Sequence, residues 1–427
     1  MRSNYTAISI RGWLIWFLCA LFFLYEFLLR TILGTFQIPL SHQLQLSPVE
    51  FALVSGTVYQ VVYSLMQIPV GFISYRYGLR KSLLLAITVC ALANLGFSLV
   101  QNFPTALLLR ALMGLGSSFG FICLLVAVYD WFPRKNCAFM IGLSQFIGTL
   151  GPMLAAGPVN ALEANGLITW REMFLLLSIV GALLAIAVVI LIHNRQDTRN
   201  DYYILTPRPA SLTSAFSHLL RQPQIWWIGF YSSSVYFALE YLSANEGISF
   251  LTMKGFDSVF SAYLITLAWL GYAIGCPVIG YLSDRLQKRK PLMLACSLLI
   301  IINLVLIIFV PAPPAAMILC FILLGIGASG QSLGFAIISE HCDSRYLAVG
   351  LAFNNTLIMT VGAFNAPMTG YLLSTTSGAP TLILYQHAFT LMLMLAVPSV
   401  LLVLFFIKET FCKPVHSLTQ LIRGTNK

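Results

Sequence analysis

The chain has 427 residues, of which 59% are hydrophobic and only 9% are charged. Water-soluble domains carry about 25% charged residues, so this composition excludes an ordinary soluble fold and predicts a protein that crosses the membrane many times. The net charge of +10 does not indicate nucleic-acid binding, because no basic stripe interleaved with aromatic residues is present.

Twelve stretches of the sequence have the length and apolar character that a helix needs to cross a bilayer. In chain order they are residues 12–40, 51–74, 82–100, 104–128, 137–159, 171–193, 225–247, 258–282, 291–310, 314–339, 347–373 and 386–407. The sequence therefore predicts an all-α membrane protein with twelve transmembrane helices. Residues 194–224 are polar and contain prolines, so we expect a cytoplasmic linker between six spans and six more.

The positions of the basic residues predict how the spans are threaded. With the N-terminus inside, 20 of the 24 lysine and arginine residues lie on the cytoplasmic side. Arg171 and Lys254 fall outside, and Arg30 and Arg110 fall within spans. We expect a multi-pass protein of the cell inner membrane, with both termini and the tail of residues 412–427 in the cytoplasm.

The two halves of the sequence resemble each other. Residues 71–81 read GFISYRYGLRK after the second span, and residues 280–290 read GYLSDRLQKRK after the eighth. GLGSSFG begins at Gly114 in the fourth span, and GIGASGQ begins at Gly325 in the tenth. Two pairs at offsets of 209 and 211 predict an internal repeat, in which residues 1–193 and 225–411 form two pseudo-symmetric six-helix bundles.

These motifs resemble those of the major facilitator superfamily, and the resemblance covers nearly the whole chain. The family's loop motif is G-x-x-x-D-R-x-G-R-[RK]. In the first copy Tyr75 replaces the aspartate, and the residues that match are Gly71, Arg76, Gly78 and Lys81, with Arg80 one place out. In the second copy Gln287 replaces the second glycine, and the residues that match are Gly280, Asp284, Arg285 and the basic cluster Lys288, Arg289 and Lys290.

Further stretches are similar to finer family patterns. Arg110, Gly114 and Gly116 match R-x-x-x-G-x-G, and GTLGP at 148–152 partly matches a motif enriched in antiporters. YEFLLR at 25–30 and YQVVYSLMQIPVG at 59–71 resemble the corresponding sequences of bacterial relatives of the lysosomal dipeptide transporters. The resemblance implies the major facilitator fold and secondary transport by alternating access.

A transporter that rocks between two states needs contacts that close its cytoplasmic side reversibly. Glycines at the ends of the second and eighth spans, Gly71, Gly78 and Gly280, allow close helix approach. Arginines at these loops can pair with carboxylates at neighbouring helix ends. We expect Arg76 and Arg80 to meet Asp130, and Arg285 and Arg289 to meet Glu340 or Asp343, with Asp284 in the second loop. The alternative is that the arginines serve topology alone, and Tyr75 weakens the case for the first loop.

Charged residues inside the spans are candidates for the transport site. A rise of 1.5 Å per residue places Glu26, Arg110 and Glu240 at one level, about 20 Å from the cytoplasmic face, with Arg30 about 25 Å along its helix. Each charge costs about 2.5–3.5 kcal/mol at a helix centre, so we expect all of them to face a wet cavity rather than lipid.

Each of these charges also has a structural interpretation. Glu26 and Arg30 stand four residues apart and can pair along one helix. Arg110 can pack against backbone carbonyls. Glu240 has no basic residue within a turn, so it must find a partner elsewhere or bind a proton, which suits proton coupling.

Polar residues on other spans extend the candidate site for substrate or proton. They are Tyr59, Gln60, Tyr63, Gln145, Tyr236, Asn354 and Asn355. Each alone is more often a hydrogen bond between helices than a ligand contact. Together with the acids and arginines, they favour a polar or zwitterionic solute.

The sequence thus predicts a secondary active transporter of a small polar or zwitterionic organic solute, such as an amino acid, a short peptide or a metal-chelating compound. Proton-coupled symport is the first interpretation. A proton-driven exporter and a non-transporting receptor or scaffold are the alternatives. No P-loop, H-E-x-x-H or G-x-S-x-G is present, so we expect no enzyme activity, cofactor or metal. The expected partners are the solute, protons and the lipid bilayer, for a monomer that binds no nucleic acid.

Overall fold

The computed structural model describes residues 10–132, 134–192, 220–342, 347–374 and 381–413. The side chains of residues 68, 71, 72, 75, 76, 129, 134–139, 347 and 348 lie outside this description. The predicted linker therefore falls largely outside the described residues, as do most of the tail and the gating candidate Asp343. Within the described ranges the chain is helical and contains no strand.

The first half of the chain forms the helices up to α10. They are α1 (Ile10–Thr31), η1 (Ile32–Gly34), α2 (Gln37–Leu44), α3 (Pro48–Ala52), η2 (Leu53–Thr57), α4 (Val58–Tyr77), α5 (Leu79–Ser98), α6 (Phe103–Ser117), α7 (Phe119–Trp131), α8 (Arg134–Ala155), α9 (Gly157–Ala164) and α10 (Trp170–Leu191). The second half contains α13 (Pro223–Ala244), α14 (Gly247–Met253), α15 (Ser258–Leu286), α16 (Lys290–Phe309), α17 (Pro314–Ala328), α18 (Gln331–His341), α19 (Leu347–Leu373), α20 (Leu382–Leu401) and η3 (Leu402–Phe406).

Ten helical segments in the described part of the chain are long and apolar enough to cross a membrane. The other two predicted spans correspond to α13 and α19. Most residues of α13 are buried, because this helix lies inside the protein and needs no lipid-facing side. The prediction of an all-α fold with twelve spans is confirmed, with short helices such as α2, α9 and α14 as additions that the apolar pattern did not reveal.

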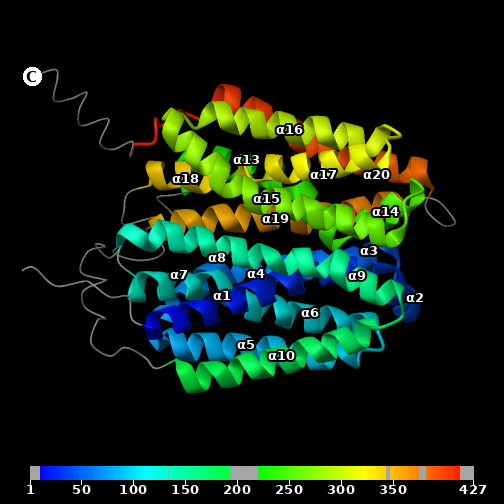
Figure 1. Cartoon of the computed structure of the whole chain (residues 1–427), viewed down its shortest axis with the longest axis horizontal. Coiled ribbons are helices and arrows are strands. Elements are labelled where there is room, and N and C mark those ends of the chain that lie inside the picture. The colour runs from blue at the N-terminus through cyan, green and yellow to red at the C-terminus, as the bar shows by residue number, and fades with distance from the viewer. Residues whose placement is uncertain (1–9, 133, 193–219, 343–346, 375–380, 414–427) are drawn as a thin grey trace, which may run out of the picture.

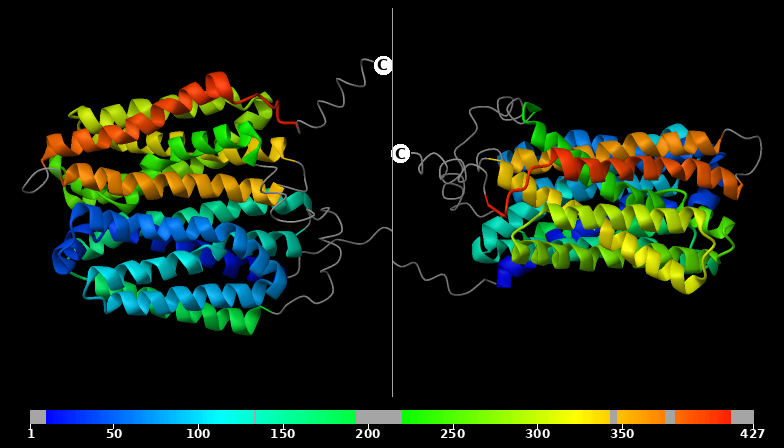
Figure 2. Two further views of the ribbon diagram at one scale, coloured as in Figure 1. Left: turned by 180° about the vertical axis from the view of Figure 1, so that it is seen from behind. Right: turned by 90° about the horizontal axis from the view of Figure 1, so that it is seen from above.

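The helices of each half gather into one bundle, and the two bundles lie side by side (Figures 1 and 2). Across the interface α3 and α4 pack on α19, α8 and α9 pack on α15, and α1 reaches α13. We name the end where α10 stops and α13 begins the linker end, and the opposite end, formed by α2, α9 and α14, the distal end. The bundle boundaries proposed from the sequence stay a prediction.

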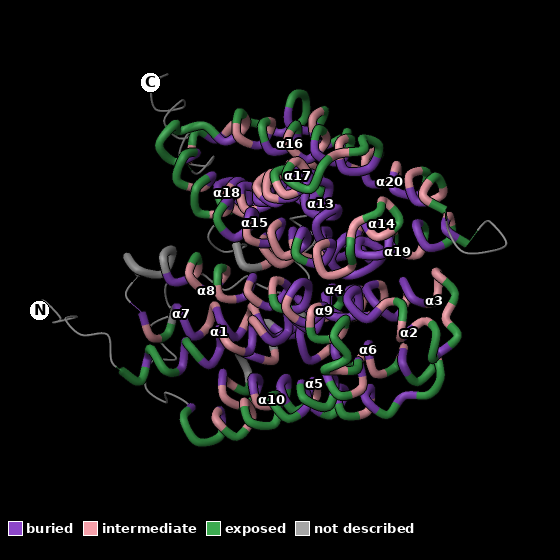
Figure 3. The backbone as a smooth tube through the Cα atoms, turned by 45° about the vertical axis from the view of Figure 1, so that its right-hand side comes forward, coloured by how far each residue is buried: buried purple, intermediate pink, exposed green. Residues whose placement is uncertain are grey.

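Exposed and buried residues separate in the way a bilayer requires. Figure 3 shows the buried residues in the interior of the two bundles and exposed residues along the outer helices. Large apolar side chains are exposed on α10 and α16, for example Leu183, Ile186 and Ile302. In water such a surface would be unfavourable, whereas lipid chains cover it without cost.

The internal repeat is visible in the way the helices pack. α6 breaks after Ser117, and α17 breaks after Ala328, at the same place in the two copies of the glycine motif. A Cβ atom on Gly114 would lie 2.5 Å from the Tyr59 carbonyl oxygen of α4. A Cβ atom on Gly325 would overlap the Ala268 carbonyl oxygen of α15 in the same way. Both glycines are therefore needed for close contact between the second and fourth spans of each half.

Candidate functional site

A buried ion pair joins the two halves in the interior. Arg30 Nε of α1 lies 3.3 Å from Glu240 Oε1 of α13, and the two side chains are 4% and 3% exposed. The two atoms are close enough for an ion pair but are not aligned for a hydrogen bond. Arg30 is thus paired across the interface, and Glu240 has the distant partner that its own helix lacks.

Glu26 has a different partner from the one its spacing suggested. The Tyr59 hydroxyl donates to Glu26 Oε2 at 3.3 Å and to the Glu26 carbonyl oxygen at 3.1 Å. No ion pair between Glu26 and Arg30 is present in the described structure, where the Arg30 guanidinium turns toward α13. The i, i+4 pair is therefore corrected to a pair between halves, because α1 lies against α13 at this level.

The surroundings of Arg30 leave much of its hydrogen-bonding capacity unused. Its guanidinium carbon lies 3.8 Å from the centre of the Phe27 ring, and Nη1 is 3.3 Å from the sulfur of Met359 on α19. Tyr236 lies beside the guanidinium. Of the three guanidinium nitrogens, Nε is the one without a hydrogen-bond partner among the described residues, so its N–H is available to a better acceptor.

Several buried polar atoms on the helices that carry or adjoin this pair have no hydrogen-bond partner among the described residues. We name their residues the central polar cluster: Glu26, Arg30, Gln60, Ser64, Glu240 and Asn354. They come from α1 and α4 in the first half and from α13 and α19 in the second. Gln60 lies against the Glu240 carboxyl. Buried polar groups are nearly always satisfied, so a cluster of unsatisfied ones indicates a place for water or a ligand.

Aromatic rings form the walls of this cluster. Tyr59 and Tyr63 are stacked with their centroids 6.2 Å apart. In the second half Tyr236 contacts Trp269 at 6.1 Å and Tyr272 at 5.7 Å. Trp269 and Tyr272 were not among the sequence candidates. The repeat offset of 209 maps Gln60 onto Trp269 and Tyr63 onto Tyr272. The internal repeat could therefore have identified Trp269 and Tyr272 as candidates from the sequence.

Arg110 is not a member of this cluster, and each of its three guanidinium nitrogens donates a hydrogen bond. Its guanidinium donates to the carbonyl oxygens of Val54 at 2.9 Å, Leu29 at 2.8 Å and Ser55 at 2.7 Å. Val54 and Ser55 belong to η2, a π-helical turn between α3 and α4. In the described part of the chain no ion pair joins Arg110 to a carboxylate. This arrangement supports the packing interpretation of Arg110, which ties α6 to α1 and η2.

The remaining candidates differ in how close they lie to the cluster. Asn355 lies beside Tyr63, and its neighbour Asn354 is the member of the cluster on α19. Gln145 is half-buried on α8, where its carbonyl oxygen accepts from Thr149 at 2.8 Å. No described hydrogen bond connects Gln145 to the cluster.

The predicted ion pair of the second loop is present at the linker end. Arg289 contacts Glu340 of α18 at 2.6 Å and Asp284 at 2.7 Å, and it also donates to Ser283. Burial alone would lower the pKa of Arg289, but its bonds to Glu340 and Asp284 raise that pKa above its ordinary value. The backbone N–H of Arg289 donates to Glu409 at 2.9 Å. All of these groups belong to the second half, so the network braces one bundle and leaves Arg285 exposed.

The first loop is arranged differently. Arg80 donates to the Val189 carbonyl oxygen of α10 at 2.7 Å, while Asp130 is exposed at the end of α7. Gly78 has φ of 79°, which favours glycine and lets α4 turn directly into α5. The side chains of Arg76 and Tyr75 lie outside the described residues, as does the packing around Gly71.

Gly280 does not provide the close helix approach that its position suggested. A Cβ atom placed there would meet no atom within 4 Å. The expectation for Gly280 is therefore wrong in this conformation, because α15 stands apart from its neighbours at that point.

The hydrogen bonds between halves lie toward the distal end. The Thr356 hydroxyl of α19 donates to the Ser64 carbonyl oxygen of α4 at 3.4 Å. The distal ones include Thr57 to the Ala363 carbonyl oxygen at 2.9 Å and the Gly157 N–H to Thr266 at 2.8 Å. The two bundles are therefore held together at the distal end in this conformation.

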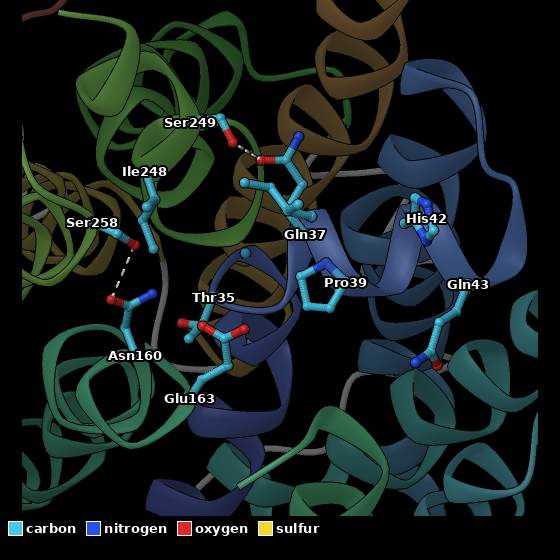
Figure 4. A pocket seen from close by; sticks show the side chains of 12 residues that line it. Thr35, Gln37, Pro39, His42, Gln43, Asn160, Glu163, Ile248, Ser249 and Ser258 are labelled. Atoms are coloured by element: carbon cyan, nitrogen blue, oxygen red, sulfur yellow. Dashed lines mark hydrogen bonds between the residues drawn. The ribbon is translucent and has the colours of Figure 1, made fainter. Parts of the chain in front are cut away.

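A pocket of about 400 Å³ opens between the halves at the distal end (Figure 4). Its lining residues are Gly34, Thr35, Gln37, Ile38, Pro39, His42, Gln43, Asn160, Glu163, Ile248, Ser249 and Ser258. The hydroxyl of Ser258 donates to Asn160 at 3.3 Å across the interface. The pocket is separate from the central polar cluster.

Comparison with known sequences identifies a family profile and several relatives. The profile of the Major Facilitator Superfamily matches residues 17–367. A probable L-galactonate transporter of Escherichia coli (strain K12) is 27% identical over 275 residues, which cover 62% of this chain and 59% of that protein. The hexuronate transporter of Bacillus subtilis (strain 168) is 24% identical over 399 residues, covering 87% and 89% of the two chains.

Solved structures share the fold at low sequence identity. A bacterial homologue of the human lysosomal transporter Spinster, in an inward-facing and unoccupied conformation, has a TM-score of 0.68 and 17% identity, with 93% of this chain and 95% of that chain covered. The nucleoside transporter NupG, in a mutant form, has a TM-score of 0.73 and 14% identity, with 93% and 100% covered.

Proposed function

This chain belongs to the Major Facilitator Superfamily, and on that basis we propose that it is a proton-coupled transporter of small solutes that carry a carboxylate. Its family and relatives are transporters of small organic solutes rather than enzymes. The finer similarity to relatives of the lysosomal dipeptide transporters stays a prediction.

The Arg30–Glu240 pair is the observation that carries this proposal. It is buried, it joins the two halves, and its 3.3 Å contact lacks hydrogen-bond alignment. A solute carboxylate can bind a guanidinium through two parallel hydrogen bonds, which are stronger than the contact that Glu240 makes. We therefore expect the solute to displace Glu240 from Arg30.

Displacement of Glu240 supplies a mechanism for proton coupling. Once Arg30 binds the solute, the Glu240 carboxylate is buried without a cation, which is unfavourable until it takes a proton. The proton and the solute then occupy the site together, and the ion pair that ties α1 to α13 is broken. The two bundles are released to rock about the site, so the proton and the solute move in the same direction.

The proposed solute class follows from the chemistry of the cluster and from the relatives. Gln60, Ser64 and Asn354 offer unsatisfied donors and acceptors that suit hydroxyl groups. The relatives described above are named for L-galactonate and hexuronate, which are sugar acids. A hydroxylated sugar acid is therefore our first choice, and a zwitterion with its ammonium on Glu26 is the second, because Glu26 Oε1 is also unsatisfied.

We place the linker end in the cytoplasm. Described basic residues such as Arg80, Lys81 and Arg289 lie there, whereas Arg171 and Lys254 lie toward the distal end. In this topology the distal end, where the two halves are hydrogen-bonded to each other, faces the outer side of the inner membrane.

Uptake by purified protein in lipid vesicles tests the proposal. Radiolabelled galacturonate, galactonate, an amino acid and a dipeptide are offered with and without an inwardly directed proton gradient. We expect a sugar acid to accumulate only when the gradient is imposed. Accumulation of the amino acid or dipeptide instead would select the zwitterion, and accumulation against an outward proton flow would indicate an exporter. Absence of carboxylate transport in any arm would contradict the role proposed for Arg30.

A further inference from the structure

At the distal end, one side chain of the first half lies between two groups of the second half. Gln37, the first residue of α2, donates through its side-chain amide to Oε2 of Glu246. Its amide oxygen accepts a hydrogen bond from the Ser249 hydroxyl of α14 (Figure 4). Both ends of this one amide are therefore used across the interface, which fixes its orientation.

Glu246 was not among the candidates from the sequence, although it is deeply buried. Its residue is 3% exposed, and its second partner is the Tyr385 hydroxyl of α20, at 3.1 Å. Among the described residues it makes no ion pair with a lysine or arginine. A buried carboxylate without a cation depends on its hydrogen-bond donors, and one of the two comes from the opposite half.

Neighbouring contacts concentrate on the same short segment. Ser55 of η2 donates to Asn245 Oδ1 at 2.6 Å, directly beside Glu246. On the other side, a Cβ atom on Gly34 would overlap the Ser243 carbonyl oxygen. The break between α13 and α14 is therefore in direct contact with η1, α2 and η2 of the first half. Gln37 and Ser249 also line the distal pocket, so solvent approaches this contact from one side.

We propose that Gln37 and Glu246 are a positioning pair that locks the distal end of the transporter closed and must separate once in every transport cycle. The pair lies at the interface that a rocking motion would open, and its parting exposes Glu246 to water, where the lost hydrogen bond is replaced. The inference rests on the alternating access of the proposed function.

Distances between spin labels on the two halves test the lock. Labels on non-natural keto amino acids avoid the nine native cysteines. A distal pair at Ala164 and Met253 uses exposed positions of α9 and α14. A linker-end pair at Gly142 and Ser339 uses exposed positions of α8 and α18, and a side chain added at Gly142 meets no atom within 4 Å.

Gln37→Glu is the disrupting variant, because it replaces the amide donor by a second carboxylate. Losing one such hydrogen bond is expected to raise the ratio of distal-open to distal-closed protein about five-fold. The distal distance should lengthen and the linker-end distance should shorten together.

A reciprocal exchange provides the rescue. In Gln37→Glu combined with Glu246→Gln, the amide and the carboxylate change places. Ser249 still has an acceptor at residue 37, while the Tyr385 hydroxyl, which donates to the same Glu246 oxygen as Gln37 does, would accept from the new amide instead. The lock predicts that both distances return to the native distribution, a recovery that general loosening of the fold would not give.

Gln43→Glu is the matched control. Gln43 lies on the same helix and accepts from Trp170 Nε1 at 2.9 Å within the first half, an acceptor role that glutamate keeps. Both distances should remain native. Unchanged distances in Gln37→Glu, in protein whose distances still respond to solute, would overturn the lock. Distal opening without shortening at the linker end would overturn alternating access itself.

Discussion

Arg30 of α1 and Glu240 of α13 form a buried ion pair between the two halves of the protein, with 3.3 Å between Nε and Oε1. The pair links the charge of the interior to the relative position of the bundles. A ligand or proton that breaks it changes both together, which is the basic requirement of a coupled transporter.

Glu240→Gln should uncouple transport from the proton gradient. Glutamine cannot take up a proton, so gradient-driven accumulation should fall at least about ten-fold, while exchange of solute across the vesicle membrane continues. Uptake and counterflow in vesicles distinguish these activities. Glu172→Gln is the control, because Glu172 is exposed and glutamine also completes its capping box with Thr169. Normal accumulation by Glu240→Gln would refute the coupling role.

Arg30→Lys should weaken solute binding more than it harms folding. Lysine keeps the charge opposite Glu240 but lacks the planar fork that binds a carboxylate at two points. The apparent KM should rise about ten-fold, equivalent to about 1.4 kcal/mol of lost binding. Uptake kinetics provide the measurement, and the melting temperature of the purified variant checks its fold. An unchanged KM would place the solute elsewhere.

Arg110→Lys should destabilise the protein without changing its selectivity. The native guanidinium serves three backbone carbonyls, and an ammonium cannot reach all three in the same geometry. Each lost charged hydrogen bond is worth about 1.5–3 kcal/mol, so the melting temperature in detergent should fall clearly. The relative uptake of different solutes should stay the same. A selectivity change at native stability would instead make Arg110 a solute ligand.

Gly114→Ala and Gly325→Ala should each lower stability, because the new methyl group meets a backbone carbonyl of the adjacent span. Overpacking of this kind costs typically about 1–3 kcal/mol. Gly142→Ala is the matched control, since its methyl group enters open space and alanine favours a helix by about 0.5–1 kcal/mol. Thermal unfolding of the three variants should separate the first two from the third. Equal melting temperatures would contradict the close packing of the repeated spans.

Glu340→Gln should slow transport more than Asp284→Asn. Both carboxylates bind Arg289, but the Glu340 side chain is 10% exposed and that of Asp284 is 65% exposed. Exposed ion pairs contribute about 0–1 kcal/mol, whereas a buried charge left without its partner costs more. Turnover in vesicles is compared at equal amounts of inserted protein. Native turnover in both variants would show that this network has no role in transport and that its arginine serves only the membrane topology.

The sequence alone determined the features that depend on local composition. Apolar runs identify the spans, because each helix must satisfy the bilayer along its own length. The repeat offset matched the two glycine motifs at Gly114 and Gly325, where the structure then shows equivalent helix breaks and close contacts. Counting residues along each helix also predicted one level for Glu26, Arg110 and Glu240, with Arg30 about 25 Å along its helix.

The tertiary structure decided which of these groups meet. Sequence spacing allowed Glu26 as the partner of Arg30, but the rotation of α1 directs the guanidinium to Glu240 on the other half. Arg110 faces carbonyls of a π-helical turn that the apolar pattern did not reveal. Glu246 became visible only where Gln37 reaches it across the interface. Such contacts depend on the rotation and packing of helices from distant parts of the chain, and hydropathy within a single span carries no information about them.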